Sequence, residues 1–161
     1  MVVSNSSPLI NMARIGRFEL LRQMFGEIII PVAVYEEVVG RGRNRDGSLD
    51  VRDASWISTA SPADSLAVSS LTSQLDLGEA SAIIVAQEHV ADLLLIDEIR
   101  GRRVAAKLGV KVLGTLGILA RAKREGLIPN LADELTRLQS TGTWMSPALR
   151  REILELAGES Q

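Results

Sequence analysis

Short runs of valine, isoleucine and leucine alternate along the chain with longer amphipathic segments. The apolar runs predict strands at residues 1–4, 27–30, 55–58, 92–96 and 110–113, and the run DLLLI at 92–96 is the strongest of them. Strands that are separated by helices imply β–α–β crossovers and a mostly parallel sheet with both faces covered. The pattern therefore predicts an α/β fold, in which ligands bind beyond the carboxyl ends of the strands.

The amphipathic segments predict the helices. The first should start at Pro8, because a proline needs no N–H in the first helical turn, and others should follow at 18–26, 32–39, 62–71, 78–88, 100–108 and 114–126. Residues 40–47, GRGRNRDG, have the glycine and charge content of a loop. Two helical segments end the chain. The last starts at Ser146–Pro147 and places Leu149, Ile153 and Leu156 at helical spacing, to pack on the domain or on a partner.

Composition narrows the classes of protein that remain. The 161 residues are enough for one domain with a real core, and 46% of them are hydrophobic. A net charge of −2 means that any binding of nucleic acid depends on a local basic patch, and an aromatic content of 3% excludes a base-stacking sheet. No cysteine and one histidine exclude disulfides, thiolate zinc sites and two-histidine zinc sites. The chain shows neither a signal peptide nor a membrane-spanning run, so we expect a cytoplasmic protein.

Acidic and amide side chains stand where such a fold would gather them. Asn5 follows the first strand, Asp97 and Glu98 follow the strongest strand, and Glu37 and Glu79 lie on predicted helices. Carboxylates that converge on one point repel one another and raise each other's pKa values, and a divalent cation removes that penalty. Oxygen ligands alone suit Mg²⁺ or Mn²⁺. Such a cation would activate water and stabilise the charge that develops on a phosphate.

Each of these side chains also has a simpler explanation. Glu36 and Glu37 are both candidates for ordinary solvated charges. Glu79 sits in the first turn of a helix, where it would complement the dipole, and Asp97 is a favoured type of N-cap. Asn5 precedes Pro8 and could form an Asx-turn or an N-cap. The residues alone therefore leave the metal site as one of several interpretations.

Basic side chains follow the last acidic pair. Arg100, Arg103 and Lys107 share neighbouring helix faces and are candidates for contacts with RNA phosphates, although a solvated helix face explains them as well. The arginines of the predicted loop, Arg41, Arg43 and Arg45, could touch RNA or simply form soluble surface.

Three segments carry a family resemblance: VVSNSSPLINMARIG, FGEIIIPVAVYEEVV, and the long run LDLGEASAIIVAQEHVADLLLIDEIRGRRVAAKLGVKVLGTLGILARAKREGLI. They resemble the PIN-like domain family related to VapC toxins, from about residue 1 to residue 130 apart from a variable stretch at about 40–75. The resemblance implies a three-layer α/β/α sandwich with a mostly parallel sheet of four or five strands. It also implies a Mg²⁺- or Mn²⁺-dependent endoribonuclease that acts as the toxin of a toxin–antitoxin pair.

The resemblance assigns roles to residues. The four acidic positions of the family, which bind the metal and catalyse, fall on Asn5, Glu37, Glu79 and Asp97, with Glu36 as the competitor of Glu37. Supporting positions fall on Ser7 (with Ser6 nearby), Glu98 and Thr115. The first position is usually Asp, so Asn5 contributes an oxygen ligand without a charge. This departure supports an alternative, a catalytically weakened or inactive module that binds RNA or another protein.

The resemblance further implies RNA as substrate, a small cognate antitoxin protein as partner, and a homodimer. The apolar segments at 9–13 and 18–21 are candidates for the dimer contact, or else cover the sheet. We expect residues 1–161 to form a single domain, in which 130–161 is an extra C-terminal helical segment outside the clear resemblance.

Overall fold

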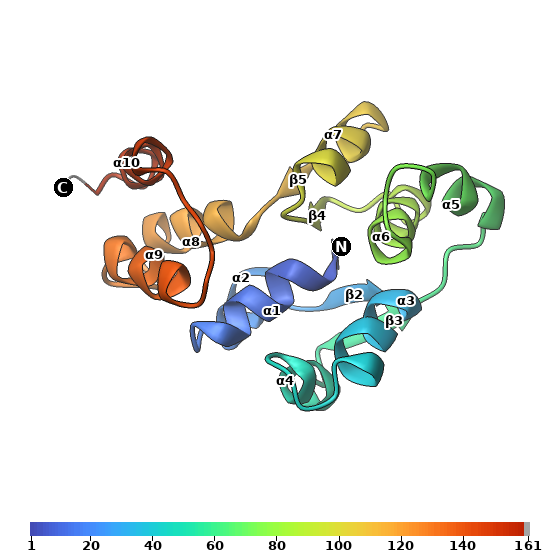
Figure 1. Ribbon diagram of the computed structural model, residues 1–161, viewed down its shortest axis with the longest axis horizontal. Coiled ribbons are helices and arrows are strands. Elements are labelled where there is room, and N and C mark those ends of the chain that lie inside the picture. Colours follow the sequence, from blue (N-terminus) through green and yellow to red (C-terminus); the bar gives the residue numbers. More distant parts are fainter. Residues whose placement is uncertain (160–161) are drawn as a thin grey trace.

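The computed structural model describes residues 1–159, which form a three-layer α/β/α sandwich around a five-stranded parallel sheet (Figure 1). The strands are β1 (Val2–Ser4), β2 (Ile28–Pro31), β3 (Ile57–Ala60), β4 (Leu93–Leu95) and β5 (Val112–Leu113), in the order β3-β2-β1-β4-β5. Every pairing is parallel. The predicted fold class and strand number are thus confirmed.

Helices connect and flank the strands. They are α1 (Ser6–Arg14), α2 (Phe18–Phe25), α3 (Val32–Tyr35), the π-helix η1 (Glu36–Arg41), α4 (Ser48–Asp53), α5 (Ser65–Leu71), α6 (Leu77–Glu88), α7 (Ile99–Lys107), α8 (Thr115–Arg124), α9 (Leu131–Ser140) and α10 (Pro147–Leu156). None of the helices in the described part of the chain is long and apolar enough to cross a membrane.

The central strands bury both of their faces. Successive side chains of a strand point to opposite faces, so Val2 and Leu95 join one hydrophobic cluster, whereas Val3 and Leu94 join a second. The second cluster lies against α5, α6 and α7 and contains half of the residues of α6. Because both faces are covered, the strands are continuous apolar runs rather than alternating ones, as parallel strands require.

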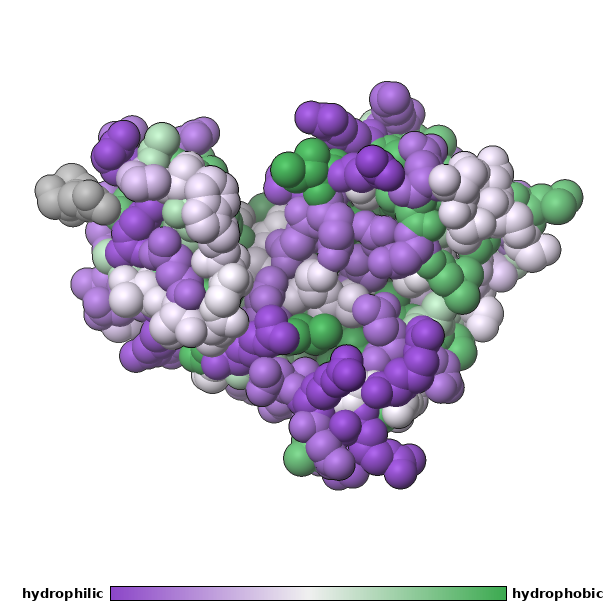
Figure 2. All heavy atoms as spheres, viewed as in Figure 1, coloured by the Kyte–Doolittle hydropathy of each residue, from purple (hydrophilic) through white to green (hydrophobic). Residues whose placement is uncertain are grey.

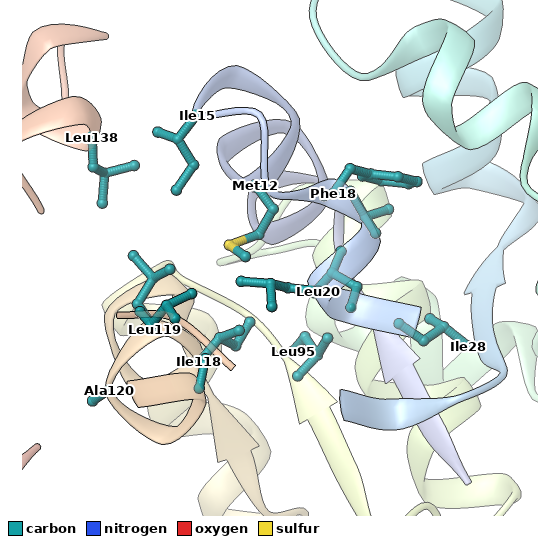
Figure 3. Close-up of a cluster of buried hydrophobic side chains, with 14 of the residues drawn as sticks. Met12, Ile15, Phe18, Leu20, Ile28, Leu95, Ile118, Leu119, Ala120 and Leu138 are labelled. Carbon is teal, nitrogen blue, oxygen red and sulfur yellow. The ribbon is translucent and has the colours of Figure 1, made fainter. Parts of the chain in front are cut away.

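The first cluster is the larger one and joins helices from both ends of the chain. Met12 and Phe18 from the first two helices and Ile118 from α8 converge on Leu95 of the sheet (Figure 3). Leu138 of α9 approaches the same cluster from the other side (Figure 3). The last two helices pack against α8 and against each other.

Several predicted boundaries were wrong by a few residues. Helix α1 begins at Ser6 rather than Pro8, and Pro8 is accommodated because the first four N–H groups of a helix need no intrahelical partner. Helix α5 begins at Ser65 rather than at Pro62, because the Asp64 side chain caps it by accepting from the N–H of Ala67 at 2.9 Å. The predicted loop at 40–47 was wrong at its start, since the π-helix extends to Arg41. Helix α4 was not predicted.

The C-terminal segment packs with a different face from the predicted one. Leu154 and Ala157 of the α10 region are buried, whereas Leu156 is 61% exposed and Leu149 is 36% exposed. The buried stripe therefore lies one position beyond the predicted stripe, and Ile153 is at its edge. The space-filling view shows a notch between the α9–α10 lobe and the α7 end of the molecule (Figure 2).

The helices suggested as a dimer contact do not present a free apolar surface. Leu9, Met12, Leu20 and Leu21 are all at most 4% exposed, because α1 and α2 cover the sheet and contact α8. The second reading of these helices, that they cover the sheet, is the correct one.

Candidate metal and phosphodiester site

The site lies where the chain direction across the sheet reverses. From β1 the chain runs outward to β2 and β3, then returns to β4 on the other side of β1. The crevice at the carboxyl ends of two such strands is the usual ligand site of an open parallel sheet. Asn5 follows β1 directly, and Asp97 and Glu98 follow β4 by two and three residues. The backbone N–H of Asn5 donates to the carbonyl of Leu95 at 2.9 Å, which joins the two strand ends.

Asn5 is buried with one side-chain atom unsatisfied. Asn5 is only 2% exposed, and its side-chain Nδ2 donates to Glu98 Oε2 at 3.2 Å. The residue stands at the N-cap position of α1, but its side chain makes no capping hydrogen bond. Within the described chain, Asn5 Oδ1 is buried and has no hydrogen-bond partner. A buried acceptor without a donor is costly, and it indicates a missing donor or cation.

The two glutamates at the start of η1 point to different surroundings. Glu37 is half-buried, and its Oε1 accepts from the Ser6 hydroxyl at 3.2 Å. Glu36 is exposed, and its carboxylate lies over Gly40 instead. A π-helix adds a residue to the turn, and such turns are frequent at functional sites. Of the two competing residues, Glu37 is the one at the strand ends.

Asp76 and Glu79 form a reciprocal pair at the start of α6. Asp76 Oδ1 accepts from the Glu79 N–H at 2.8 Å, and Glu79 Oε2 accepts from the Asp76 N–H at 3.0 Å. This capping box satisfies two helix donors and gives Glu79 a structural role as well as its position in the site. Asp76 was not among the predicted site residues, although an acid three residues before Glu79 is the signature of a capping box.

Gly78 leaves a small cradle between three oxygen atoms. A Cβ added at Gly78 would lie 3.0 Å from Glu37 Oε2, 3.4 Å from Asp76 Oδ1 and 3.5 Å from Asn5 Oδ1. The unsatisfied oxygen of Asn5 thus faces the same point as two carboxylates. Two carboxylates and one amide oxygen are the kind of donors that hard divalent cations prefer.

Asp97 is held by a different set of partners. Its carboxylate accepts from the N–H of Thr115 at 2.6 Å, from the hydroxyl of Thr115 at 2.7 Å and from Asn11 Nδ2 at 3.0 Å. These contacts tie the end of β4 to the start of α8 and to α1. The residue at the N-cap of α7 is Glu98, not Asp97. Asn11 was not singled out in the sequence, where it appears as an ordinary polar position of an amphipathic helix.

Glu98 accepts hydrogen bonds from two side chains that follow β1, those of Asn5 and Ser7. It accepts from Asn5 Nδ2 at 3.2 Å and also from the hydroxyl of Ser7. Ser6 and Ser7 therefore divide their contacts, since Ser6 donates to Glu37 and Ser7 donates to Glu98.

The acidic side chains of the site repel one another. Burial raises the pKa of Glu37, and the Asp76 and Glu98 carboxylates raise it further, against the opposing effects of Ser6 and Arg41. Burial also raises the pKa of Glu79, again with repulsion from Asp76 and Glu98. Among the ion pairs of residues 1–159, none involves these acids or Asp97. A cation at the strand ends would relieve this repulsion.

The acids alone do not complete the four-ligand centre that the resemblance implied. Within residues 1–159, no group of three or more acidic or histidine side chains is arranged to hold a metal ion. The fit to a divalent cation rests on the mixed set at Gly78, where the amide of Asn5 takes the place of a third carboxylate.

The predicted RNA-binding residues lie along α7 at differing distances from this site. Arg100 donates to the carbonyl of Gln74 at 3.3 Å, so it bridges to the segment before α6. Arg103 lines a mainly apolar hollow with Ile99 and Val112, and Lys107 is exposed in the last turn. The neighbouring Arg102 lies near Asp97, because both side chains approach within 3.5 Å of the Cβ position at Gly114.

Comparison with known proteins agrees with this architecture. The family model DUF3368, described as a PIN domain, matches residues 1–159. No curated protein matches the chain. The match extends beyond residue 130, where the resemblance in the sequence became indistinct, and it includes both C-terminal helices. The parallel sheet with an acidic crevice is the nuclease-type fold that PIN domains share. The chain therefore belongs to the PIN domain family.

Proposed function

We propose that the protein is a Mg²⁺- or Mn²⁺-dependent endoribonuclease that hydrolyses RNA phosphodiester bonds. The observation that carries the proposal is the buried, unpartnered Asn5 Oδ1, which faces the carboxylates of Glu37 and Asp76 across the space left by Gly78. Membership of the PIN domain family supports a nuclease. Burial and the neighbouring carboxylates raise the pKa of Glu37, which supports a site that a bound cation would stabilise.

The residues of the chain would divide the work as follows. Asn5, Glu37 and Asp76 hold the cation, Ser6 orients Glu37, and the capping box with Glu79 fixes Asp76. A bound divalent cation supplies Lewis-acid stabilisation of the phosphate and eases the ionisation of a water. Hydrolysis forms a bond between the water oxygen and phosphorus and breaks a bridging P–O bond. One proton of the water passes to the departing ribose oxygen, and the other is released. Glu98, half-buried and bonded to Asn5, is the carboxylate placed to accept that proton.

Asp97 acts in this proposal by positioning. With three donors from Thr115 and Asn11, its carboxylate holds the ends of β4 and β5 and the first helix in one arrangement. Asp97 Oδ1 accepts a single hydrogen bond, so its second lone pair stays open for the predicted role of Asp97 as a direct ligand.

The test is cleavage of a labelled mixed RNA pool by the purified protein with Mn²⁺, Mg²⁺ or EDTA. Glu37→Gln is the informative variant and Glu36→Gln is its matched control, because the neighbouring Glu36 is exposed outside the crevice. We expect metal-dependent cleavage that Glu37→Gln abolishes and Glu36→Gln retains. Cleavage that persists in EDTA, or that both variants retain, would refute the assignment.

A second candidate is an inactive PIN module that binds RNA or a protein. The observation that favours it is that Asn5 adds no charge to the cradle and already donates Nδ2 to Glu98. Under this alternative the native protein does not cut RNA, and Asn5→Asp restores cutting because a third carboxylate completes the cation site.

The biological role that we propose is the toxin of a toxin–antitoxin pair, acting in the cytoplasm as a homodimer and neutralised by a small antitoxin protein. A short antitoxin-like reading frame beside the gene, and growth arrest that its product reverses, are the expected observations. Light scattering of the purified protein measures its molar mass in solution, and we expect twice the 17.4 kDa of one chain. We also propose that the C-terminal segment predicted at 130–161, of which the last two residues lie outside the described part, belongs to the same single domain. Leu131, Leu135 and Leu138 of this segment are buried in the larger cluster with Met12.

A further inference from the structure

A hollow of about 460 Å³, with four charged residues in its lining, opens beside the cation cradle. It is lined by Glu37, by the two arginines Arg41 and Arg45, and by the first residues of α6, Asp76, Leu77 and Gly78. Glu37, Asp76 and Gly78 belong to both the cradle and the hollow, so a ligand in the hollow lies next to a cation in the cradle. In the space-filling view, hydrophilic side chains gather over the α3–α4 end of the molecule (Figure 2).

The two arginines are available to a ligand. Both are exposed, and within residues 1–159 neither guanidinium forms a hydrogen bond or an ion pair. Arg41 ends η1, which also carries Glu37, so the π-helix holds a carboxylate and a guanidinium at one edge of the hollow. Guanidinium groups bind phosphate oxygens with paired, charge-assisted hydrogen bonds.

The third arginine of the segment points elsewhere. Arg43 lines a separate hollow with Glu36, Val39 and Arg52, on the other side of η1. Gly42 makes the turn possible, because a Cβ there would lie 2.3 Å from the carbonyl oxygen of Val38. The chain thus directs Arg41 and Arg45 towards the crevice and Arg43 away from it.

The start of α6 adds further donors to the hollow. The first N–H groups of a helix have no intrahelical partner and carry the positive end of its dipole. The capping box satisfies the N–H of Glu79, which leaves those of Leu77 and Gly78 at the edge of the hollow. Independently, the buried and unpartnered Asn5 Oδ1 faces the cradle and indicates a cation there. An anion beside that cation balances its charge.

We propose that Arg41 and Arg45 form a phosphate subsite for a single-stranded RNA substrate, next to the phosphodiester held at the cradle. The inference rests on the proposed nuclease function and names the side from which the RNA enters. It also favours two of the loop arginines over the α7 residues as phosphate contacts, since Arg100 is engaged with Gln74 and Arg103 lines an apolar hollow.

The test is RNA affinity rather than cleavage. Fluorescence anisotropy measures the binding of a fluorescein-labelled single-stranded RNA of 12 nucleotides, about three binding sites of four nucleotides each. Ca²⁺ replaces Mg²⁺ and Mn²⁺ in the binding buffer, and a gel checks that the RNA stays intact. Arg41→Ala and Arg45→Ala are compared with Arg43→Ala, a matched control of the same type in the same segment. For each of the first two we expect affinity to fall about fivefold or more, and the slope of log K against log salt to lose about 0.7.

The control decides between a built subsite and general charge attraction. An equal loss in Arg43→Ala would overturn the proposal, and so would unchanged affinity in both Arg41→Ala and Arg45→Ala. Cleavage by the native protein is measured separately. If the native protein cuts RNA but the two variants bind normally, the subsite is wrong and the nuclease stands. If it binds through these arginines without cutting, the subsite stands and the nuclease is wrong.

Discussion

Gly78→Ala should separate cation binding from folding in a single variant. The added methyl group would occupy the cradle, 3.0 Å from Glu37 Oε2 and within 3.5 Å of the Asp76 and Asn5 oxygens. The atom in closest contact is the end of a flexible side chain, which can withdraw by a few tenths of an ångström. No carboxylate is removed, so the net charge of the site is unchanged. The substitution therefore blocks the cation by volume alone.

The two expected effects have opposite signs. Gly78 lies in α6 and does not have a positive φ, and alanine is better than glycine in a helix by up to about 1 kcal/mol. The metal-free variant should thus be as stable as the native protein or melt up to about 2–4 °C higher. The native protein should gain about 2.7 kcal/mol at a Mn²⁺ concentration 100 times its Kd, or roughly 5–10 °C. The variant should lose this gain.

The assay is thermal unfolding of both proteins over a Mn²⁺ titration, with EDTA as the zero point. The melting temperature in EDTA reports whether the variant folds, and the shift with Mn²⁺ reports the site. A variant that is markedly less stable in EDTA, or one that retains the full Mn²⁺ shift, would show that Gly78 does not open the cation position.

Three further predictions concern charge. Arg17→Met should destabilise the protein by about 2–3 kcal/mol in urea unfolding. The reason is that Glu134 is 1% exposed and would keep only the more exposed Arg137 as its partner. The exposed Arg22–Glu19 pair is the control, and Arg22→Met should lower the free energy of unfolding by less than about 0.5 kcal/mol. Asn5→Asp should tighten Mn²⁺ binding in calorimetry yet lower the melting temperature in EDTA, because it turns the hydrogen bond to Glu98 into repulsion; equal affinities would contradict it. A glutamate whose pKa is raised in the folded state binds its proton more tightly there than in the unfolded chain. The protein therefore loses stability as pH rises above the ordinary glutamate pKa of 4.5. Metal-free Glu37→Gln should therefore be more stable than the native protein at pH 7 and lose that advantage below pH 4.5, as unfolding curves at the two pH values will show.

Much of the fold could be predicted from periodicity, and the errors have local causes. The apolar runs located the central strands β1, β2 and β4, because strands buried on both faces must be continuously hydrophobic. The edge strand β3 is partly exposed and begins two residues later than predicted. Helix starts were less accurate, since a proline marks the first turn without specifying its position within it, as Pro8 shows. Helix α4 and the end of η1 lie in a glycine- and charge-rich stretch whose composition is typical of a loop.

The candidate site was predictable in part. Asn5, Glu37 and Glu98 meet at the strand ends, where a parallel sheet gathers residues that follow adjacent strands. Asp76 was missed because its signal, an acid three residues before a glutamate, has an adequate explanation as a helix cap. The orientations of Arg41, Arg43 and Arg45 depend on a π-turn that no spacing rule specifies.

The class of fold, the types of ligand atom and the absence of cysteine chemistry could be inferred from the amino-acid sequence, because they follow from local periodicity and from which residues exist. Which oxygens share a point depends on long-range packing. Asn5, Glu37 and Asp76 come from three separate elements, and their approach around Gly78 depends on how α6 and η1 pack across the strand ends. Long-range packing sets such distances to within an ångström, and no local pattern in the chain records them.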